Sequence, residues 1–174
     1  MEKFEHISVK GLDFNPKKMG DLLYYDSPLL SHFQDPNQPK EHYFYRWVDN
    51  DDQVNRWLIF KNTDAEVLSF FNKSCGELDL IQKNNALTLL DLDDNLNKVG
   101  IYVSSLTNIP SAYLPTNKAF FDENRYESYA LTLKKKLETT LQEENILFQI
   151  LKKVQNLEKE QKNTKKILSE LLTK

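Results

Sequence analysis

The chain has 174 residues and a net charge of −3, and 40% of its residues are hydrophobic and 11% aromatic. This composition supplies a hydrophobic core for one modest domain with an appendage and argues against global disorder. No apolar segment approaches the roughly 18 residues that span a bilayer, and the N-terminus lacks the apolar stretch of a signal peptide. The single cysteine, Cys75, has no partner for an internal disulfide, which is typical of a reducing compartment. Together, these features predict a cytoplasmic protein without a membrane anchor.

The N-terminal part of the chain predicts a β-sheet. Short runs of aliphatic and aromatic residues, separated by Asp, Asn, Ser and Pro, are typical of antiparallel strands. Two of the runs are rich in Tyr, Phe and Trp and flank a polar loop from Asp49 to Asn55, which indicates a hairpin. The pattern predicts a four-stranded meander at residues 22–25, 29–33, 42–48 and 56–61, with a further short strand at Phe4, Ile7 and Val9.

A helix is predicted to follow the meander. Thr63 and Glu66 have the spacing of a capping box, in which each side chain satisfies a backbone amide at the start of a helix. We expect Gly76 to end this helix, because glycine is common just after the last helical turn.

A second hairpin is predicted from two apolar runs, residues 86–90 and 99–103, with the acidic segment that begins at Asp91 in its turn. An irregular segment with two prolines follows. The predicted fold of residues 1–122 is therefore α+β, an antiparallel β-meander with one or two short helices.

Residues 123–174 form a second predicted unit, a single long helix. They contain neither glycine nor proline and are rich in helix-forming residues. From Leu147 onward, apolar residues recur in alternating steps of three and four, which is typical of a coiled coil. The predicted core positions are Leu147, Ile150, Val154, Leu157, Gln161, Thr164, Leu168 and Leu171.

The residues that flank this apolar seam favour a parallel arrangement of identical chains. In a parallel, in-register coil, each residue at heptad position g meets the e residue five places later in the neighbouring helix. Two of the resulting pairs are apolar and two carry opposite charges. They are Ile146 with Leu151, Lys153 with Glu158, Glu160 with Lys165, and Ile167 with Leu172.

The same flanking residues indicate how many chains associate. A two-stranded coil would leave the apolar e and g residues in water, so we expect a trimer or tetramer rather than a dimer. Gln161 and Thr164 would place polar layers in the coil, which fix its register at some cost in stability. Two other interpretations of the helix stay open: it folds back on the sheet, or it pairs with a different protein.

The densest acidic cluster contains Asp49, Asp51 and Asp52 and is interpreted first as a solvated hairpin tip. A calcium loop of the EF-hand type needs Gly at its sixth place and Glu at its twelfth, and Val54 and Phe60 stand there instead. An alternative function remains for this cluster, a small enzyme or enzyme subunit that uses these carboxylates with a divalent ion.

Arg56 follows the acidic loop directly. Arginine makes fixed contacts to carboxylates, so we expect Arg56 either to pair with Asp49, Asp51 or Asp26 or to recognise an acidic group of a partner. Together with two neighbouring tyrosines, these residues form the expected partner-binding surface. It comprises Tyr24, Tyr25, Asp26, Asp49, Asp51, Asp52 and Arg56.

Motifs for metal, nucleotide or covalent chemistry are not found in the sequence. His6, His32 and His42 are scattered and have no ligand spacing, so we predict no metal site. The four glycines form no phosphate-binding loop, and no G-x-S-x-G elbow occurs. We predict neither catalytic residues nor a cofactor.

Three segments carry a resemblance to a known family. They are Leu22 to Leu30, Tyr43 to Asp49 and Asn55 to Phe60, and over roughly residues 20–80 the chain resembles an uncharacterised family of small bacterial proteins. The resemblance implies a bacterial or phage-related origin and no particular activity. The predicted coiled coil lies outside it.

These observations predict a non-enzymatic, homo-oligomeric adaptor. Its head would bind a protein partner of unknown identity, and its coil would multiply the copies so that avidity strengthens weak contacts. By analogy with its bacterial setting, regulation of a toxin or a role in phage defence is the expected context. Nucleic acid is an unlikely partner, because the residues before position 125 are acidic overall and phosphate contacts supply most of that affinity. Nucleic-acid binding remains as an alternative function, and it would use a basic site at Lys134, Lys135 and Lys136 on the long helix.

Overall fold

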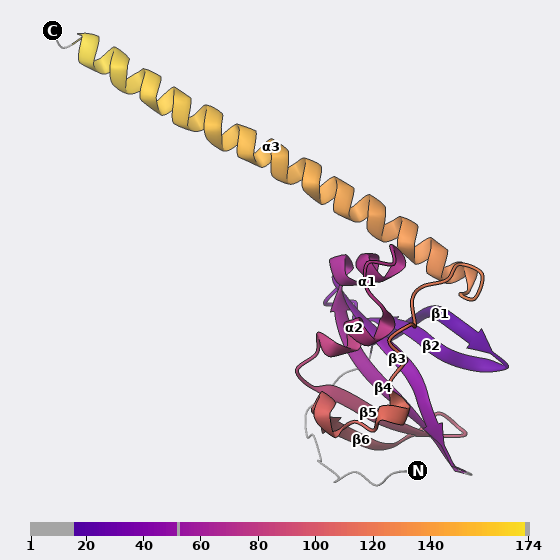
Figure 1. The fold of residues 1–174 in the computed structure, drawn as a ribbon. Coiled ribbons are helices and arrows are strands. Elements are labelled where there is room, and N and C mark those ends of the chain that lie inside the picture. Colours follow the sequence, from indigo (N-terminus) through magenta and orange to yellow (C-terminus); the bar gives the residue numbers. More distant parts are fainter. Residues whose placement is uncertain (1–15, 52, 173–174) are drawn as a thin grey trace. The chain divides into compact units, whose positions relative to one another are not determined.

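The computed structural model describes residues 16–51 and 53–172, and within them six strands form one antiparallel sheet (Figure 1). The strands lie in the sheet in the order in which they occur in the chain, so each pairs with its sequence neighbour. This arrangement confirms the predicted α+β class and joins the meander and the second hairpin into one sheet. The strands are β1 (Lys17–Tyr25), β2 (Ser27–Gln34), β3 (Glu41–Asn50), β4 (Val54–Thr63), β5 (Leu87–Asp93) and β6 (Lys98–Ser104).

The central hairpin of β3 and β4 is held by aromatic residues that face each other across the two strands. Phe44 pairs with Phe60 in the register, and their ring centroids are 5.4 Å apart. Trp47 is likewise opposite Trp57. Cross-strand aromatic pairs of this kind stabilise antiparallel sheets, which explains why this hairpin is the clearest strand signal in the sequence.

Helix α1 (Asp64–Phe71) begins at the predicted capping box. The amide of Thr63 donates to Glu66 Oε2 over 2.9 Å, and the amide of Glu66 donates to the Thr63 hydroxyl over 3.5 Å. The helix ends at Phe71, five residues before Gly76, so the predicted end of the helix is wrong. Gly76 instead precedes α2 (Glu77–Gln82), and its amide donates to Asp79 Oδ2 over 2.7 Å.

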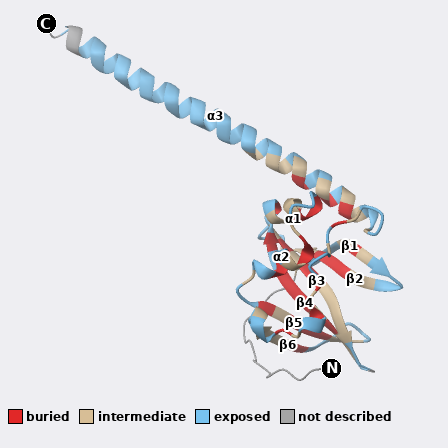
Figure 2. Cartoon of the chain, viewed as in Figure 1, coloured by how far each residue is buried: buried red, intermediate tan, exposed pale blue. Residues whose placement is uncertain are grey.

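The main hydrophobic core lies between one face of the sheet and the helices (Figure 2). Leu58 and Phe60 of β4 contribute from the sheet, and Val67 and Phe71 contribute from α1. Two short 3₁₀ helices follow β6 in the predicted irregular segment, η1 (Leu106–Asn108) and η2 (Ser111–Tyr113), and Tyr113 is part of the core.

The chain divides into two compact units, with the boundary between Leu137 and Glu138. Helix α3 (Ser128–Leu172) contributes residues to both. In the first unit, Ala130, Leu133 and Leu137 are buried in the main core, so this unit extends beyond residue 122, where the sequence places the end of the head. The strand predicted at Phe4, Ile7 and Val9 lies outside the described residues.

Candidate functional site

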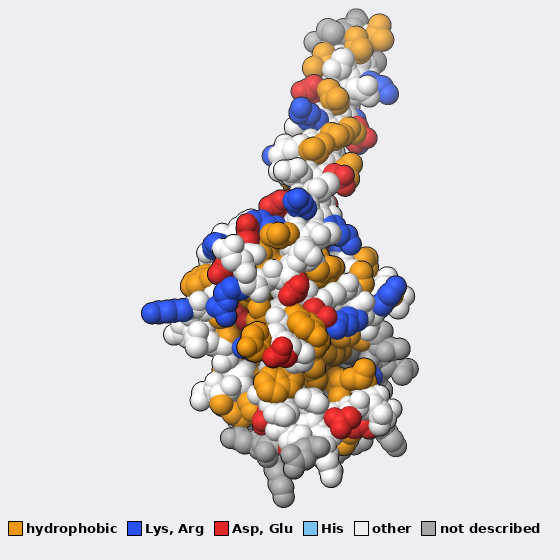
Figure 3. All heavy atoms as spheres, turned by 90° about the vertical axis from the view of Figure 1, so that its right-hand side faces the viewer, with side chains coloured by type: hydrophobic (Ala, Val, Ile, Leu, Met, Phe, Trp, Pro, Cys, Tyr) orange, Lys and Arg blue, Asp and Glu red, His pale blue; other side chains and the backbone are white. Residues whose placement is uncertain are grey.

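The seam predicted from heptad spacing lies on the part of α3 that belongs to the second unit. Its apolar side chains are exposed, with exposed fractions of 64% for Leu147, 52% for Ile150, 45% for Val154, 61% for Leu157 and 53% for Leu168. Large aliphatic side chains are usually buried, so a row of exposed ones is a candidate interaction surface. Figure 3 shows hydrophobic side chains along this helix between charged ones.

The two polar positions of the seam, Gln161 and Thr164, are exposed as well. The Thr164 hydroxyl donates to the carbonyl oxygen of Glu160 over 3.0 Å, so its hydrogen-bonding need is already met within the helix. Leu171 lies inside α3, but its side chain is outside the described part. The long helix is confirmed, and its pairing with other chains stays a prediction.

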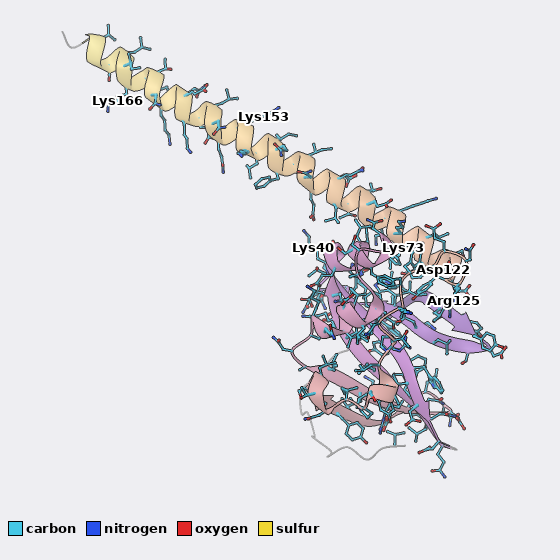
Figure 4. The ribbon with its side chains drawn as sticks, in the orientation of Figure 1. Lys40, Lys73, Asp122, Arg125, Lys153 and Lys166 are labelled. Carbon is cyan, nitrogen blue, oxygen red and sulfur yellow. The ribbon has the colours of Figure 1, made fainter. Side chains whose placement is uncertain are left out.

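The residues that flank the seam are exposed too. Ile146, Leu151 and Ile167 have exposed fractions of 60%, 56% and 57%. Phe148, which the heptad assignment does not include, is 63% exposed and widens the apolar surface at the start of the seam. Lys153, at a g position, lies on the exposed part of the helix with its side chain directed outward (Figure 4).

The predicted partner-binding tyrosines lie at the tight turn between β1 and β2. Tyr24 and Tyr25 are 48% and 74% exposed, and Asp26 between the two strands has a positive φ of 54°. The Tyr24 hydroxyl donates to the carbonyl oxygen of Asp26 over 3.4 Å. Two exposed aromatic rings at a turn form a small surface that can contact another protein.

The two described members of the acidic cluster, Asp49 and Asp51, accept hydrogen bonds within the head. Asp51 Oδ1 accepts from the backbone amides of Gln53 and Val54, over 3.1 and 3.0 Å, and so shapes the turn between β3 and β4. Asp49 Oδ2 accepts from the Tyr113 hydroxyl over 2.5 Å. Asp52 lies outside the described residues. No group of three His, Cys, Asp or Glu residues that could hold a metal ion is found in the part of the chain that the structure describes.

Arg56 is buried and forms an ion pair with Asp91, which is a correction to the partners expected from the sequence. Arg56 Nε donates to Asp91 Oδ1 and Nη2 donates to Oδ2, each over 2.7 Å, a two-point contact that fixes both side chains. The prediction placed Asp91 in a turn, whereas it lies in β5 directly opposite Arg56. Because only 3% of the Arg56 side chain is exposed, it is unsuited to contact a partner.

A buried hydrogen-bonded chain was missed by sequence reasoning. Asp64 Oδ1 is 2.5 Å from His42 Nε2, His42 Nδ1 is 2.8 Å from His32 Nε2, and His32 Nδ1 is 2.7 Å from the Tyr129 hydroxyl. Burial, together with the nearby charges of His42 and Lys136, lowers the pKa of His32 to about 3. Burial also lowers the pKa of His42, although Asp64 opposes this effect.

The two histidines meet because β2 and β3 are paired. In the register, His32 is opposite Phe44 and His42 is opposite Gln34, so the histidines are diagonal neighbours on one face. Gly20 of β1 is opposite His32, and a Cβ atom there would lie 2.6 Å from the ring of Tyr129. These hydrogen bonds from Asp64 to Tyr129 thus join the sheet to the first residues of α1 and α3, which indicates a structural role.

The face of the sheet opposite the main core carries a second apolar cluster. Tyr45, Ile59 and Leu90 are buried there, and five partly buried hydrophobic side chains pack against them. The rings of Phe33 and Tyr45 stack with centroids 4.0 Å apart. Alternation along the strands predicts that each strand has two faces, but sequence reasoning assigned no function to this one.

The basic site considered for nucleic acid is partly neutralised. Lys134 Nζ is 3.6 Å from Glu123 Oε1. Lys136 is exposed, and its positive charge helps to lower the pKa of both buried histidines. Lys134 therefore already has an acidic partner, and this pairing does not favour a dedicated phosphate-binding surface at the three lysines.

Comparisons of the chain with protein-family models, with curated proteins and with solved structures find no match. The resemblance of residues 20–80 to a bacterial family therefore stays an expectation. Among the described residues, no helix is both long enough and apolar enough to cross a membrane.

Proposed function

We propose that this chain is a non-enzymatic adaptor that forms a parallel homo-oligomer through α3 and acts in the cytoplasm. The observation that carries the proposal is the exposed seam from Leu147 to Leu168. Removing a leucine or isoleucine side chain from water contributes roughly 1.5–3 kcal/mol, so several such residues per chain provide a substantial driving force for association.

Charge complementarity supports identical chains as the partners. With parallel helices in register, Lys153 meets Glu158 and Glu160 meets Lys165, and every chain supplies both members of each pair. Exposed ion pairs contribute only about 0.2–1 kcal/mol each, so they select the orientation rather than drive association.

The width of the apolar surface supports more than two chains. Ile146, Leu151 and Ile167 are all more than half exposed, and they extend beyond the stripe that a dimer would bury. In a trimer or tetramer, each helix is covered by two neighbours, and residues beside the a and d positions become part of the interface.

The head supplies the surface for a protein partner. The exposed rings of Tyr24 and Tyr25, beside Asp26, remain suitable for such a contact, and Asp51 adds exposed negative charge at the β3–β4 turn. Aromatic residues are enriched in protein interfaces. Several heads on one coil would convert weak individual contacts into tight binding through effective concentration.

Light scattering after size-exclusion chromatography tests the assembly. We expect the wild-type protein at micromolar concentration to have a mass of three or four times 20.5 kDa. Leu157→Glu should shift it to monomers, because it places a charge in the seam. Lys159→Glu is the matched control at an outward heptad position and should leave the mass unchanged. A monomeric wild-type protein would refute the proposal.

A further inference from the structure

The face of the sheet opposite the main core is more apolar than a face in water normally is. Antiparallel sheets with one solvated face usually alternate apolar and polar residues. In β4, Leu58 and Phe60 belong to the main core, yet Trp57 and Ile59 on the opposite face are apolar as well. Leu90 of β5 continues this second apolar face. A strand that is apolar on both faces is typical of a sheet that is covered on both faces.

This face is hollowed by a cavity of about 260 Å³. Its floor is formed by Tyr43 and Tyr45 of β3, Ile59 of β4, Leu90 of β5 and Ile101 of β6, so four adjacent strands contribute. The volume lies just below the roughly 300–1,000 Å³ of sites for drug-sized ligands, so the hollow has room for a small ligand.

The two charged side chains that line the cavity are both positive. Lys61 and Lys98 line it together with Asn84, and no Asp or Glu is among its described lining residues. Lys61 is 2.9 Å from Glu41, whereas Lys98 is exposed and has no ion pair within the described ranges. The ammonium group of Lys98 can pair with an anionic group of a ligand. The apolar hollow beside it can accommodate an apolar part of the same ligand.

We propose that this cavity binds a small amphipathic anion of the medium-chain carboxylate class. The aliphatic body would lie on Tyr45, Ile59 and Leu90, and the carboxylate would pair with Lys98. This site is independent of the proposed oligomer, since every lining residue belongs to the first unit.

Calorimetric titration of the full chain with decanoate tests the proposal. We expect saturable binding with one site per chain. Lys98→Glu should weaken decanoate binding by about tenfold or more, because it replaces the pairing charge with a repelling one. Decanol has the same apolar body without the charge, and its binding should change little in this variant.

Two further variants separate this cavity from other apolar surfaces. Ala86 is exposed and lines the cavity, so Ala86→Trp should obstruct it and abolish binding of both decanoate and decanol. Lys159→Glu makes the same charge change as Lys98→Glu, but on α3, and should leave both affinities unchanged. The proposal is overturned by an absence of saturable binding, by equal decanoate affinity in wild type and Lys98→Glu, or by unchanged binding in Ala86→Trp.

Discussion

At the scale of residues, the buried polar groups of the head depend on partners that are distant in the sequence. Arg56 and Asp91 are each almost fully buried, and each would carry an uncompensated charge without the other. Breaking a buried ion pair by removing one partner costs about 3–5 kcal/mol, so this pair makes the register of β4 and β5 specific. Its tight engagement also explains why Arg56 belongs to the framework of the head rather than to its partner-binding surface.

The buried histidines make the stability of the head depend on pH. The folded state holds His32 neutral because its pKa is lowered from 6.5 to about 3, whereas the unfolded chain takes up a proton near pH 6.5. The contribution of neutral His32 to the stability of the folded state is therefore fully present above about pH 6.5, and it is lost as the pH falls toward 3. Between these limits, the free energy of unfolding should decrease by about 1.4 kcal/mol for each pH unit on account of this residue.

Urea denaturation from pH 7 to pH 4.5 measures this effect. His32→Gln removes the titrating group and should show a shallower loss of stability than the wild-type protein. The comparison between the two proteins cancels the carboxylates that also titrate in this range. Equal slopes in both proteins would show that His32 is not held neutral by the fold.

At the scale of elements, the two parts of α3 differ in burial. Its first residues are buried in the head, and its later residues expose a seam with charged flanks. The charges provide a test of orientation. In a parallel coil, Lys153→Glu places two glutamates opposite each other at every interface, and Glu158→Lys places two lysines there, so each should lower the melting temperature of the coil.

The double variant Lys153→Glu with Glu158→Lys restores opposite charges and should recover most of the loss. Circular dichroism at low salt measures all four proteins, because screening weakens exposed ion pairs. Losses in the single variants that simply add in the double variant would argue against the parallel, in-register arrangement.

At the scale of the whole molecule, α3 contributes to the core of the head and also carries the exposed seam. Leu133 and Leu137 are 4% and 2% exposed in the core of the head. Ending the chain after residue 125 would remove both, and each large core side chain contributes about 2–5 kcal/mol. We expect that shortened chain to be strongly destabilised in urea denaturation.

A chain that ends after residue 144 keeps these core residues and lacks the seam. It should unfold as a stable head and remain monomeric in light scattering. If both shortened chains are equally stable, then the start of α3 does not contribute to the core as described.

The local signals of the sequence were sufficient for the fold class and for the approximate positions of the strands and of the long helix. Runs of aliphatic and aromatic residues predicted the six strands, Thr63 and Glu66 predicted the start of α1, and the absence of glycine and proline predicted the long helix. Such signals act within a few residues of the chain, because backbone preference and capping are local effects.

Only the tertiary structure decided which distant residues meet. The strand register brings Asp91 to Arg56 and His32 to His42, and packing places Leu133 in the head and forms the cavity on the second apolar face. These contacts depend on how separate elements pair and pack, and no spacing within a single element encodes them. For the same reason, the spacing of residues within α3 displays its apolar seam, whereas any contact that this seam makes would depend on a second surface.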